Sequence, residues 1–202
     1  EADGGSLRSG YVNQVEHLAQ LGAFPYWYQQ LNRNLGRFAQ HSNGVLSRLE
    51  PQGLEDHPLP GPSGRGAILL KFGEGEDALV VVVMHLALGG GTRSRQLAYI
   101  RELIGGYRHQ VLMGDMNTHA TDLLENSPLR DLGLQAPQIA ATFPSWRPQR
   151  CLDHILLSPS LTLERVDVLS HAISDHLPVA VEIRLPDSLL GDAFPVPLDK
   201  AQ

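Results

Sequence analysis

Cysteine is almost absent from this chain of 202 residues, and its absence excludes several kinds of site. Cys151 is the single cysteine, so the chain forms no intrachain disulfide and offers no cysteine-based zinc site. Lysine is nearly as scarce, because Lys71 and Lys200 are the only two and all other basic residues are arginines. Arginine favours bidentate phosphate contacts, although coding bias explains the same composition without any function.

Long hydrophobic runs and a positive net charge are missing as well. No apolar stretch reaches the length that spans a membrane. The formal net charge is -6, so the whole surface does not attract nucleic acid, and any basic patch has to be local. Nine histidines are present, but no His-Glu-x-x-His or comparable ligand spacing occurs. A zinc hydrolase is therefore a low-ranked alternative. The 42% of hydrophobic residues suits one globular domain with a sizeable core.

The hydrophobic pattern predicts more strands than helices. Helices are expected over residues 6–21 and 93–104, where apolar residues recur at helical spacing. The apolar run of residues 79–84 predicts a central strand buried on both faces, and the Pro- and Gly-rich residues 52–66 predict a loop. Further strands are expected at residues 24–30, 45–48, 67–72, 111–114, 151–157, 161–169 and 178–183. This pattern predicts a two-sheet sandwich with helices outside.

Residues 111–117 combine a buried apolar run with polar side chains at its end. Gly114 stops the run, and Asp115 and Asn117 follow two residues apart. On an extended backbone alternate side chains share a face, so these two side chains are expected to enter one pocket while Met116 points back into the core. Gly114 removes a side chain where the backbone turns or a ligand approaches. Taken alone, the pair is explained equally well as ordinary turn residues.

Three more strand ends carry similar side chains: His85, Asp153 with His154, and Asp175 with His176. For each one alone, a satisfied core residue, a cap or an exposed side chain is the simpler interpretation. Four unrelated accidents in one small domain are less expected. Together these groups are what phosphate-ester hydrolysis requires, because carboxylates hold a hard cation, a carboxylate orients an imidazole, and an amide donates to an oxyanion.

Four motifs follow one another along the chain. They are His85-Leu86 after a valine run, Gly114-Asp115-Met116-Asn117, Leu152-Asp153-His154-Ile155-Leu156 and Ser174-Asp175-His176-Leu177-Pro178-Val179. Their order resembles the endonuclease/exonuclease/phosphatase superfamily, whose fold is that of pancreatic deoxyribonuclease. The strand at residues 43–48 and the start Glu1-Ala2-Asp3 are also similar to family segments, so the resemblance covers residues 1 to about 184. It implies an α/β fold, a four-layer α/β/β/α sandwich of two mixed sheets.

The resemblance implies a metal site at the start of the chain. Glu1 and Asp175 would hold Mg²⁺, for which Mn²⁺ can substitute, and Asp115 would orient or deprotonate the attacking water. In the family a strand precedes this glutamate, so the expected sandwich lacks its first strand. The domain is expected to cover residues 1–185, followed by a proline-rich tail at residues 186–202.

The resemblance also implies contacts with the phosphate. Asn117 would hydrogen-bond the scissile phosphate, and His176, held by Asp153, would contact a phosphate oxygen. His85 would sit on the phosphate and help the leaving group depart. Which imidazole acts as the base stays open at this point. The implied activity is hydrolysis of a phosphodiester or phosphomonoester.

Substrate contacts are expected from arginines and a tryptophan near these motifs. Trp146, Arg147 and Arg150 can stack on a base and clamp a phosphate, while a packed tryptophan with solvated arginines is an equal alternative. Arg93 opens a helix beside His85, which suits an anion, although an exposed helical arginine needs no function. Nucleic acid, phospholipid headgroups and inositol phosphates all stay open as substrates. A non-catalytic binding domain that keeps the fold, with a nucleic-acid or protein partner, is the alternative from another class.

Overall fold

The structure, a computed structural model, describes residues 2–137 and 139–189 of the chain. The strands are β1 (Ala2–Asp3), β2 (Tyr26–Asn34), β3 (Gln40–Ser47), β4 (Gly53–Pro58), β5 (Gly66–Phe72), β6 (Leu79–His85), β7 (His109–Asp115), β8 (Asp153–Leu157), β9 (Thr162–Val168) and β10 (Val179–Arg184). The helices are α1 (Gln14–Leu21), α2 (Gly90–Ile104) and α3 (Ala120–Glu125), with short 3-10 turns η1 (Leu7–Ser9), η2 (Gly75–Asp77), η3 (Arg130–Leu132) and η4 (Asp187–Leu189).

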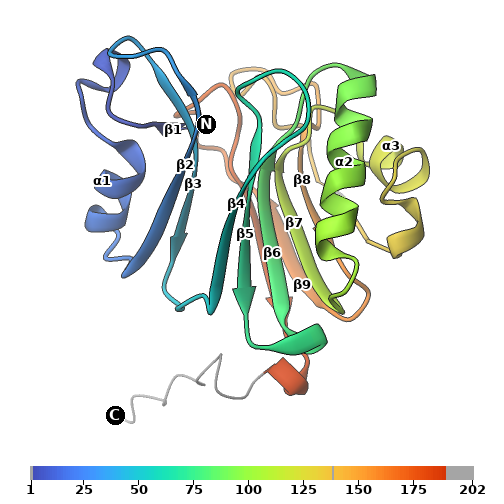
Figure 1. The fold of residues 1–202 in the computed structure, drawn as a ribbon. Coiled ribbons are helices and arrows are strands. Elements are labelled where there is room, and N and C mark those ends of the chain that lie inside the picture. Colours follow the sequence, from blue (N-terminus) through green and yellow to red (C-terminus); the bar gives the residue numbers. More distant parts are fainter. Residues whose placement is uncertain (1, 138, 190–202) are drawn as a thin grey trace.

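A five-stranded sheet in the order β4-β5-β6-β7-β8 forms the centre of the molecule. β6 and β7 are parallel, while the other neighbours in this sheet are antiparallel. Because α2 crosses from the end of β6 back to the start of β7, both strands end at the same edge of the sheet (Figure 1). β6 is the middle strand, as predicted for residues 79–84: Val80 and Val82 are fully buried on one face, and Val81 and Val83 are partly buried on the other.

The second layer consists of two smaller sheets, β1-β3-β2 and β10-β9. Both pack on one face of the large sheet, since Tyr28, Val45 and Ile183 join a core cluster with Ile68 and Val111. α2 and α3 cover the other face of the large sheet, and α1 covers the outer face of β2 and β3 (Figure 1). These four layers confirm the predicted α/β/β/α sandwich. Within the described residues, no strand joins the two smaller sheets to each other.

Two local predictions are wrong. The helix expected from residue 6 begins only at Gln14, where the side chain of Asn13 caps α1. Asp3 instead holds the backbone and the hydroxyl of Ser6, and Tyr11 adopts a φ of 65°, which a helix does not allow. The loop expected at residues 52–66 contains β4, an edge strand whose polar, mostly exposed side chains hide the strand pattern.

The end of the described chain reaches further into the fold than expected. Leu189, beyond the expected domain end at residue 185, is buried and packs in the same core cluster as Leu161. The remaining residues of the expected tail, 190–202, lie outside the described residues.

His109, at the start of β7, is a buried polar group far from the strand ends that carry the motifs. Its Nδ1 lies 2.8 Å from the hydroxyl of Ser160, which itself donates to the carbonyl of Arg108, so Nδ1 is the donor. Within the described chain, Nε2 is buried without a hydrogen-bond partner. Burial lowers the pKa of His109 below its ordinary value, against an opposing effect of Asp77.

We expect acidification from about pH 7.5 to about 5.5 to destabilise the fold partly through His109. The unfolded chain binds a proton on this imidazole in that range while the folded chain resists it, so stability is lost as the pH falls. His109→Gln should therefore lose less unfolding free energy over this range than the wild type, as measured by urea denaturation at both pH values. His17→Gln, an exposed histidine on α1, is the matched control and should behave like the wild type. An unchanged loss in His109→Gln would contradict the assignment.

Candidate active site

The carboxyl ends of β6 and β7 meet the start of β8 at one edge of the large sheet. The register pairs His85 with Asp115 and Asp115 with Asp153. The backbone N–H of Leu86 donates to the carbonyl of Asp115 at 3.0 Å and extends the pairing past the strand end. Three polar residues that are far apart in the sequence therefore lie side by side.

Gly114 allows this close pairing of β6 with β7. Its φ is 138°, a backbone conformation that residues with a side chain rarely adopt. A Cβ atom at this position would lie only 1.9 Å from the carbonyl oxygen of Met84 in the neighbouring strand. The glycine that the sequence placed before the polar pair is thus required by the backbone itself.

Asp115 lies at the centre of the cluster and is about one-fifth exposed (20%). Its Oδ2 is 3.3 Å from Nε2 of His85 and 4.0 Å from Nε2 of His176, and its Oδ1 accepts the backbone N–H of Asn117. Burial alone would raise the pKa of Asp115, but the hydrogen bond of His85 and the charge that His85 carries when protonated, with smaller effects of the Asn117 N–H and of protonated His176, lower it overall. Asp115 is therefore an ionised hydrogen-bond acceptor at neutral pH.

Asn117 converges with Asp115 through a turn and not through strand alternation. β7 ends at Asp115, and Asn117 adopts a φ of 51°, stabilised by its N–H bond to the Asp115 carboxylate. One N–H of its side-chain amide donates to the carbonyl of Leu86 at 2.8 Å. Met116 between them is fully buried, as predicted.

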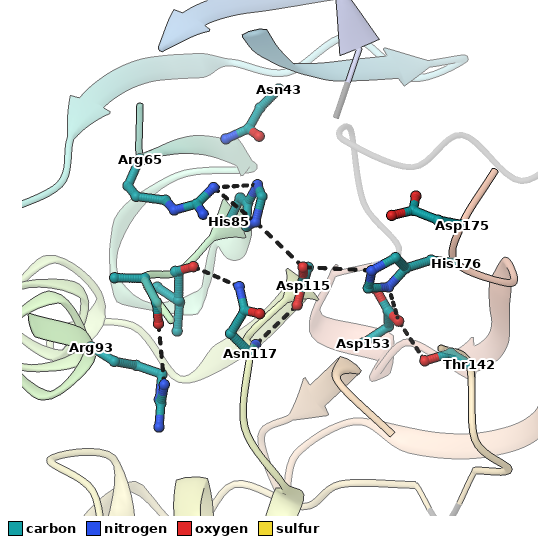
Figure 2. Close-up of polar contacts among 12 residues, drawn as sticks. Asn43, Arg65, His85, Arg93, Asp115, Asn117, Thr142, Asp153, Asp175 and His176 are labelled. Carbon is teal, nitrogen blue, oxygen red and sulfur yellow. Dashed lines mark hydrogen bonds and ion pairs between the residues drawn. The ribbon is translucent and has the colours of Figure 1, made fainter. Parts of the chain in front are cut away.

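His176 is held by a carboxylate and an aromatic ring. Its Nδ1 lies 2.7 Å from Oδ2 of Asp153, an oxygen that also accepts the hydroxyl of Thr142. The ring of Phe143 packs against the imidazole with centroids 4.8 Å apart. Since Nδ1 donates to Asp153, Nε2 of the neutral ring carries the lone pair and faces Asp115 (Figure 2).

Asp175 contributes an exposed carboxylate on the other side of His176. Its Oδ1 accepts the hydroxyl of Ser174 at 3.0 Å, and Figure 2 shows the carboxylate facing the same space as His85. The carbonyl of Asp175 accepts the N–H of Ser145 at 2.8 Å, and the Ser145 hydroxyl donates to the carbonyl of Ser174. These bonds tie the loop before β8 to the loop that carries His176.

Sequence reasoning missed Arg65, Asn43 and Thr142. Nη1 of Arg65 lies 3.0 Å from Nδ1 and 2.9 Å from Nε2 of His85. A guanidinium only donates and Nε2 also faces a carboxylate, so the consistent assignment puts the His85 proton on Nε2 and the accepting lone pair on Nδ1. Only the position of Arg65 directly before an apolar strand could have suggested it, which is a weak signal.

Two residues of the predicted set are not brought to this cluster. His154 points to the opposite face of β8, where it is buried and its Nε2 contacts the carbonyl of Thr118 at 2.8 Å. Burial lowers the pKa of His154. Arg93 donates to the carbonyls of Ala87 and Leu88. It points away from the active-site cavity, the space between His85, Asp115 and His176 in Figure 2, so its expected contact with substrate is not supported.

Trp146, Arg147 and Arg150 lie in the exposed loop that precedes β8. Trp146 is 74% exposed, so the alternative of a packed tryptophan is wrong. The guanidinium of Arg150 lies 5.9 Å from the centroid of Phe143, the ring that packs on the His176 imidazole. The base of this loop therefore contacts the cluster while its tip is open to solvent.

The described donors fit a hydrated hard cation only in part. Within residues 2–137 and 139–189, no three His, Cys, Asp or Glu side chains are grouped to hold a metal ion. Imidazoles engage Asp115 and Asp153, whereas Asp175 offers a carboxylate of the kind that Mg²⁺ uses, often with several waters. Glu1, the other expected ligand, lies outside the described residues.

Residues 7–176 match the Endonuclease/Exonuclease/phosphatase family, and the chain belongs to this family. No curated protein sequence matches the chain. In the part of the chain that the structure describes, no helix combines the length and the apolar character needed to cross a membrane.

Solved structures share the fold. The endonuclease/exonuclease/phosphatase from Beutenbergia cavernae superposes with a TM-score of 0.70 and 22% identity over 87% of this chain, which spans 58% of that protein's length. A mannosyl-6-phosphatase from Bacteroides thetaiotaomicron gives a TM-score of 0.63 and 16% identity, covering 85% of this chain and 81% of that one. TDP2 from D. rerio, complexed with a single-strand DNA product, gives 0.63 and 14%, covering 84% and 81%.

Gly114→Ala should destabilise the protein by more than about 3 kcal/mol, because the new Cβ meets the Met84 carbonyl and the backbone is strained. Denaturant unfolding measures the loss. Gly91→Ala is the matched control, since a Cβ at this position in α2 meets nothing within 4 Å and alanine favours the helix. A stability of Gly114→Ala within error of the control would show that the strands do not approach so closely.

Asp153→Ala should both destabilise the fold and release His176. The substitution leaves the Thr142 hydroxyl and the imidazole N–H without their acceptor, which we expect to cost about 1–3 kcal/mol. Asp153→Asn keeps one acceptor oxygen and should recover part of this loss. NMR of the imidazole nitrogens should report an Nδ1–H tautomer in the wild type and a mixture in Asp153→Ala. Unchanged melting together with an unchanged tautomer would contradict the pairing.

Proposed function

We propose that the protein is a metal-dependent phosphoesterase, which hydrolyses phosphodiester or phosphomonoester bonds by attack of water. The observation that carries this proposal is the convergence of His85, Asp115, Asn117, Asp153 and His176 at one edge of the sheet. The structural relatives support the substrate class, since one is named a phosphatase and another is complexed with a DNA product.

Magnesium, or manganese in its place, would be held by Glu1 and Asp175, and when bound it would polarise the phosphoryl oxygens and make a water more acidic. The exposed position of the Asp175 carboxylate beside His176 supports this assignment. Among the described residues, only the Asp175 carboxylate fits the metal in this way.

Asp115 orients the attacking water, and His176 accepts its proton. The lowered pKa of Asp115 makes its carboxylate a poor base but a good hydrogen-bond acceptor, which suits the orientation of water. Nε2 of His176 faces Asp115 with its lone pair and accepts the proton of this water. Asp153, bonded to Nδ1, stabilises the imidazolium that results. As the water oxygen bonds to phosphorus, the bond from phosphorus to the alcohol oxygen breaks, and the released alcohol takes up a proton from the solvent.

Three donors suit the charge on the phosphoryl group. The second amide N–H of Asn117 is not used by the carbonyl of Leu86, and Nε2–H of His85 points toward Asp115 and the cavity. The Arg65 guanidinium lies against His85 and adds a fixed positive charge. Hydrogen bonds from these groups stabilise the charge that develops on the non-bridging oxygens.

The exposed loop before β8 supplies contacts with the rest of the substrate. Trp146 offers an aromatic face, and Arg147 and Arg150 offer charges for a second phosphate or another anionic group. Because Ser145 ties this loop to Asp175, a substrate held there lies next to the reacting centre.

His176→Gln should lower kcat/KM for bis-p-nitrophenyl phosphate in the presence of Mg²⁺ by about 10²–10⁴-fold, because glutamine cannot take the proton. Release of p-nitrophenol measures the rate, and chelation of the metal should abolish it. His17→Gln, an exposed histidine on α1, should retain wild-type turnover. Urea denaturation of both variants should match the wild type closely.

Retained turnover in His176→Gln would refute the assignment of the base. Absence of metal-dependent turnover with diester and monoester substrates alike, from a folded protein, would refute the proposed activity. That second outcome favours the alternative, a binding domain that keeps the fold without catalysis.

A further inference from the structure

Asn43 of β3 brings a second sheet to the cavity. The side chain is 7% exposed, and Figure 2 shows it across from Arg65 and His85, with its amide directed toward them. Within the described residues, Asn43 brings the sheet β1-β3-β2 to a site that is otherwise built on the large sheet and its loops.

The amide of Asn43 has a fixed orientation because Gln30 behind it is fixed. The two N–H groups of Gln30 Nε2 are shared among three acceptors, Oδ1 of Asp56 and the carbonyls of His57 and Ala67. Its nitrogen side is therefore assigned, and its Oε1 is left to accept a hydrogen bond.

Nδ2 of Asn43 donates one hydrogen to Oε1 of Gln30 at 3.1 Å and the other to the carbonyl of Gly66 at 3.0 Å. Both hydrogens of Nδ2 are thus used, and Figure 2 shows Oδ1 on the side that faces His85. Within the described chain, Oδ1 of Asn43 has no hydrogen-bond partner. The buried network holds a hydrogen-bond acceptor toward the site at little entropic cost.

The acceptor Oδ1 of Asn43 recognises a different part of the substrate from the phosphate, which is bound by donors. Arg65, His85 and Asn117 present donors, which match the phosphoryl oxygens. Oδ1 of Asn43 would repel a phosphate oxygen, and it requires a donor such as a hydroxyl group. A substrate without that donor takes the place of water at Oδ1 of Asn43 without supplying a hydrogen bond, which lowers its affinity.

We propose that Oδ1 of Asn43 accepts a hydrogen bond from a hydroxyl group on the alcohol of the phosphoester. The site would then prefer polyol or sugar phosphates to esters of simple alcohols. This inference rests on the proposed phosphoesterase function and names its substrate class.

Matched esters test the preference. Glycerol 1-phosphate and propyl phosphate form a monoester pair, and diglyceryl phosphate and dipropyl phosphate form a diester pair, which differ only in hydroxyl groups. We expect the wild type to hydrolyse the glycerol ester of at least one pair with a kcat/KM about tenfold or more above that of its propyl partner, and Asn43→Ala to bring this ratio close to unity. The ratio does not depend on the folded fraction, so partial destabilisation of the variant does not obscure it. Asn34→Ala, an exposed asparagine at the end of β2, should keep the wild-type ratio.

Equal rates for both esters in the wild type, or an unchanged ratio in Asn43→Ala, would overturn the inference. A parallel loss on both esters would also overturn it, since that pattern belongs to a metal ligand or a structural residue. Calorimetric binding of glycerol 1-phosphate and propyl phosphate to the wild type separates the two proposals. If no ester is hydrolysed, the phosphoesterase function fails. Tighter binding of the glycerol ester than of the propyl ester, with this difference lost in Asn43→Ala, would still support the hydroxyl contact. Equal binding of the two esters to the wild type would refute it.

Discussion

The parallel pairing of β6 with β7 is the constraint on which the site depends. It sets His85 opposite Asp115, and the next pairing sets Asp115 opposite Asp153. The approach at the strand end leaves no room for a Cβ atom at Gly114, whose position would overlap the Met84 carbonyl. A side chain there would separate the strand ends and, with them, the imidazole and the carboxylate. The chemistry of the site is thus tied to a backbone requirement that lies in the sheet and not in the polar residues themselves.

Two aspartates in similar positions have different environments, and the difference divides their roles. Asp153 is occupied by the Thr142 hydroxyl and by Nδ1 of His176, so it can only position and stabilise that ring. Asp115 lies between two imidazoles and a backbone N–H, which together lower its pKa despite burial, and its Oδ2 remains oriented toward the cavity. In the proposed mechanism one carboxylate therefore acts through a histidine, while the other is available to a water molecule.

Periodicity in the sequence was sufficient where neighbouring residues decide the structure. The buried strand at residues 79–84, the burial of Met116 and the sandwich layers were predicted correctly. It failed at β4, an edge strand whose polar residues carry no burial pattern, and before α1, where bonds from Asp3 to Ser6 replace a helical turn. Arg65 and Asn43 were missed for a different reason, because their positions depend on strand pairing and on the packing of two sheets, which no local pattern encodes.

A polar network between two sheets requires a physical reason, because buried amides are costly unless every group is paired. Gln30 and Asn43 are both buried, and apolar side chains of similar size would fill the same volume without any need for partners. The network satisfies each of its donors, including both hydrogens of Nδ2 of Asn43, and turns one acceptor oxygen to the cavity. Stability alone does not explain that arrangement, whereas recognition does, since an acceptor held by a rigid pair of sheets discriminates between substrates that differ by one hydroxyl group. The smaller sheet then contributes selectivity to a centre whose reactive groups the larger sheet and its loops provide.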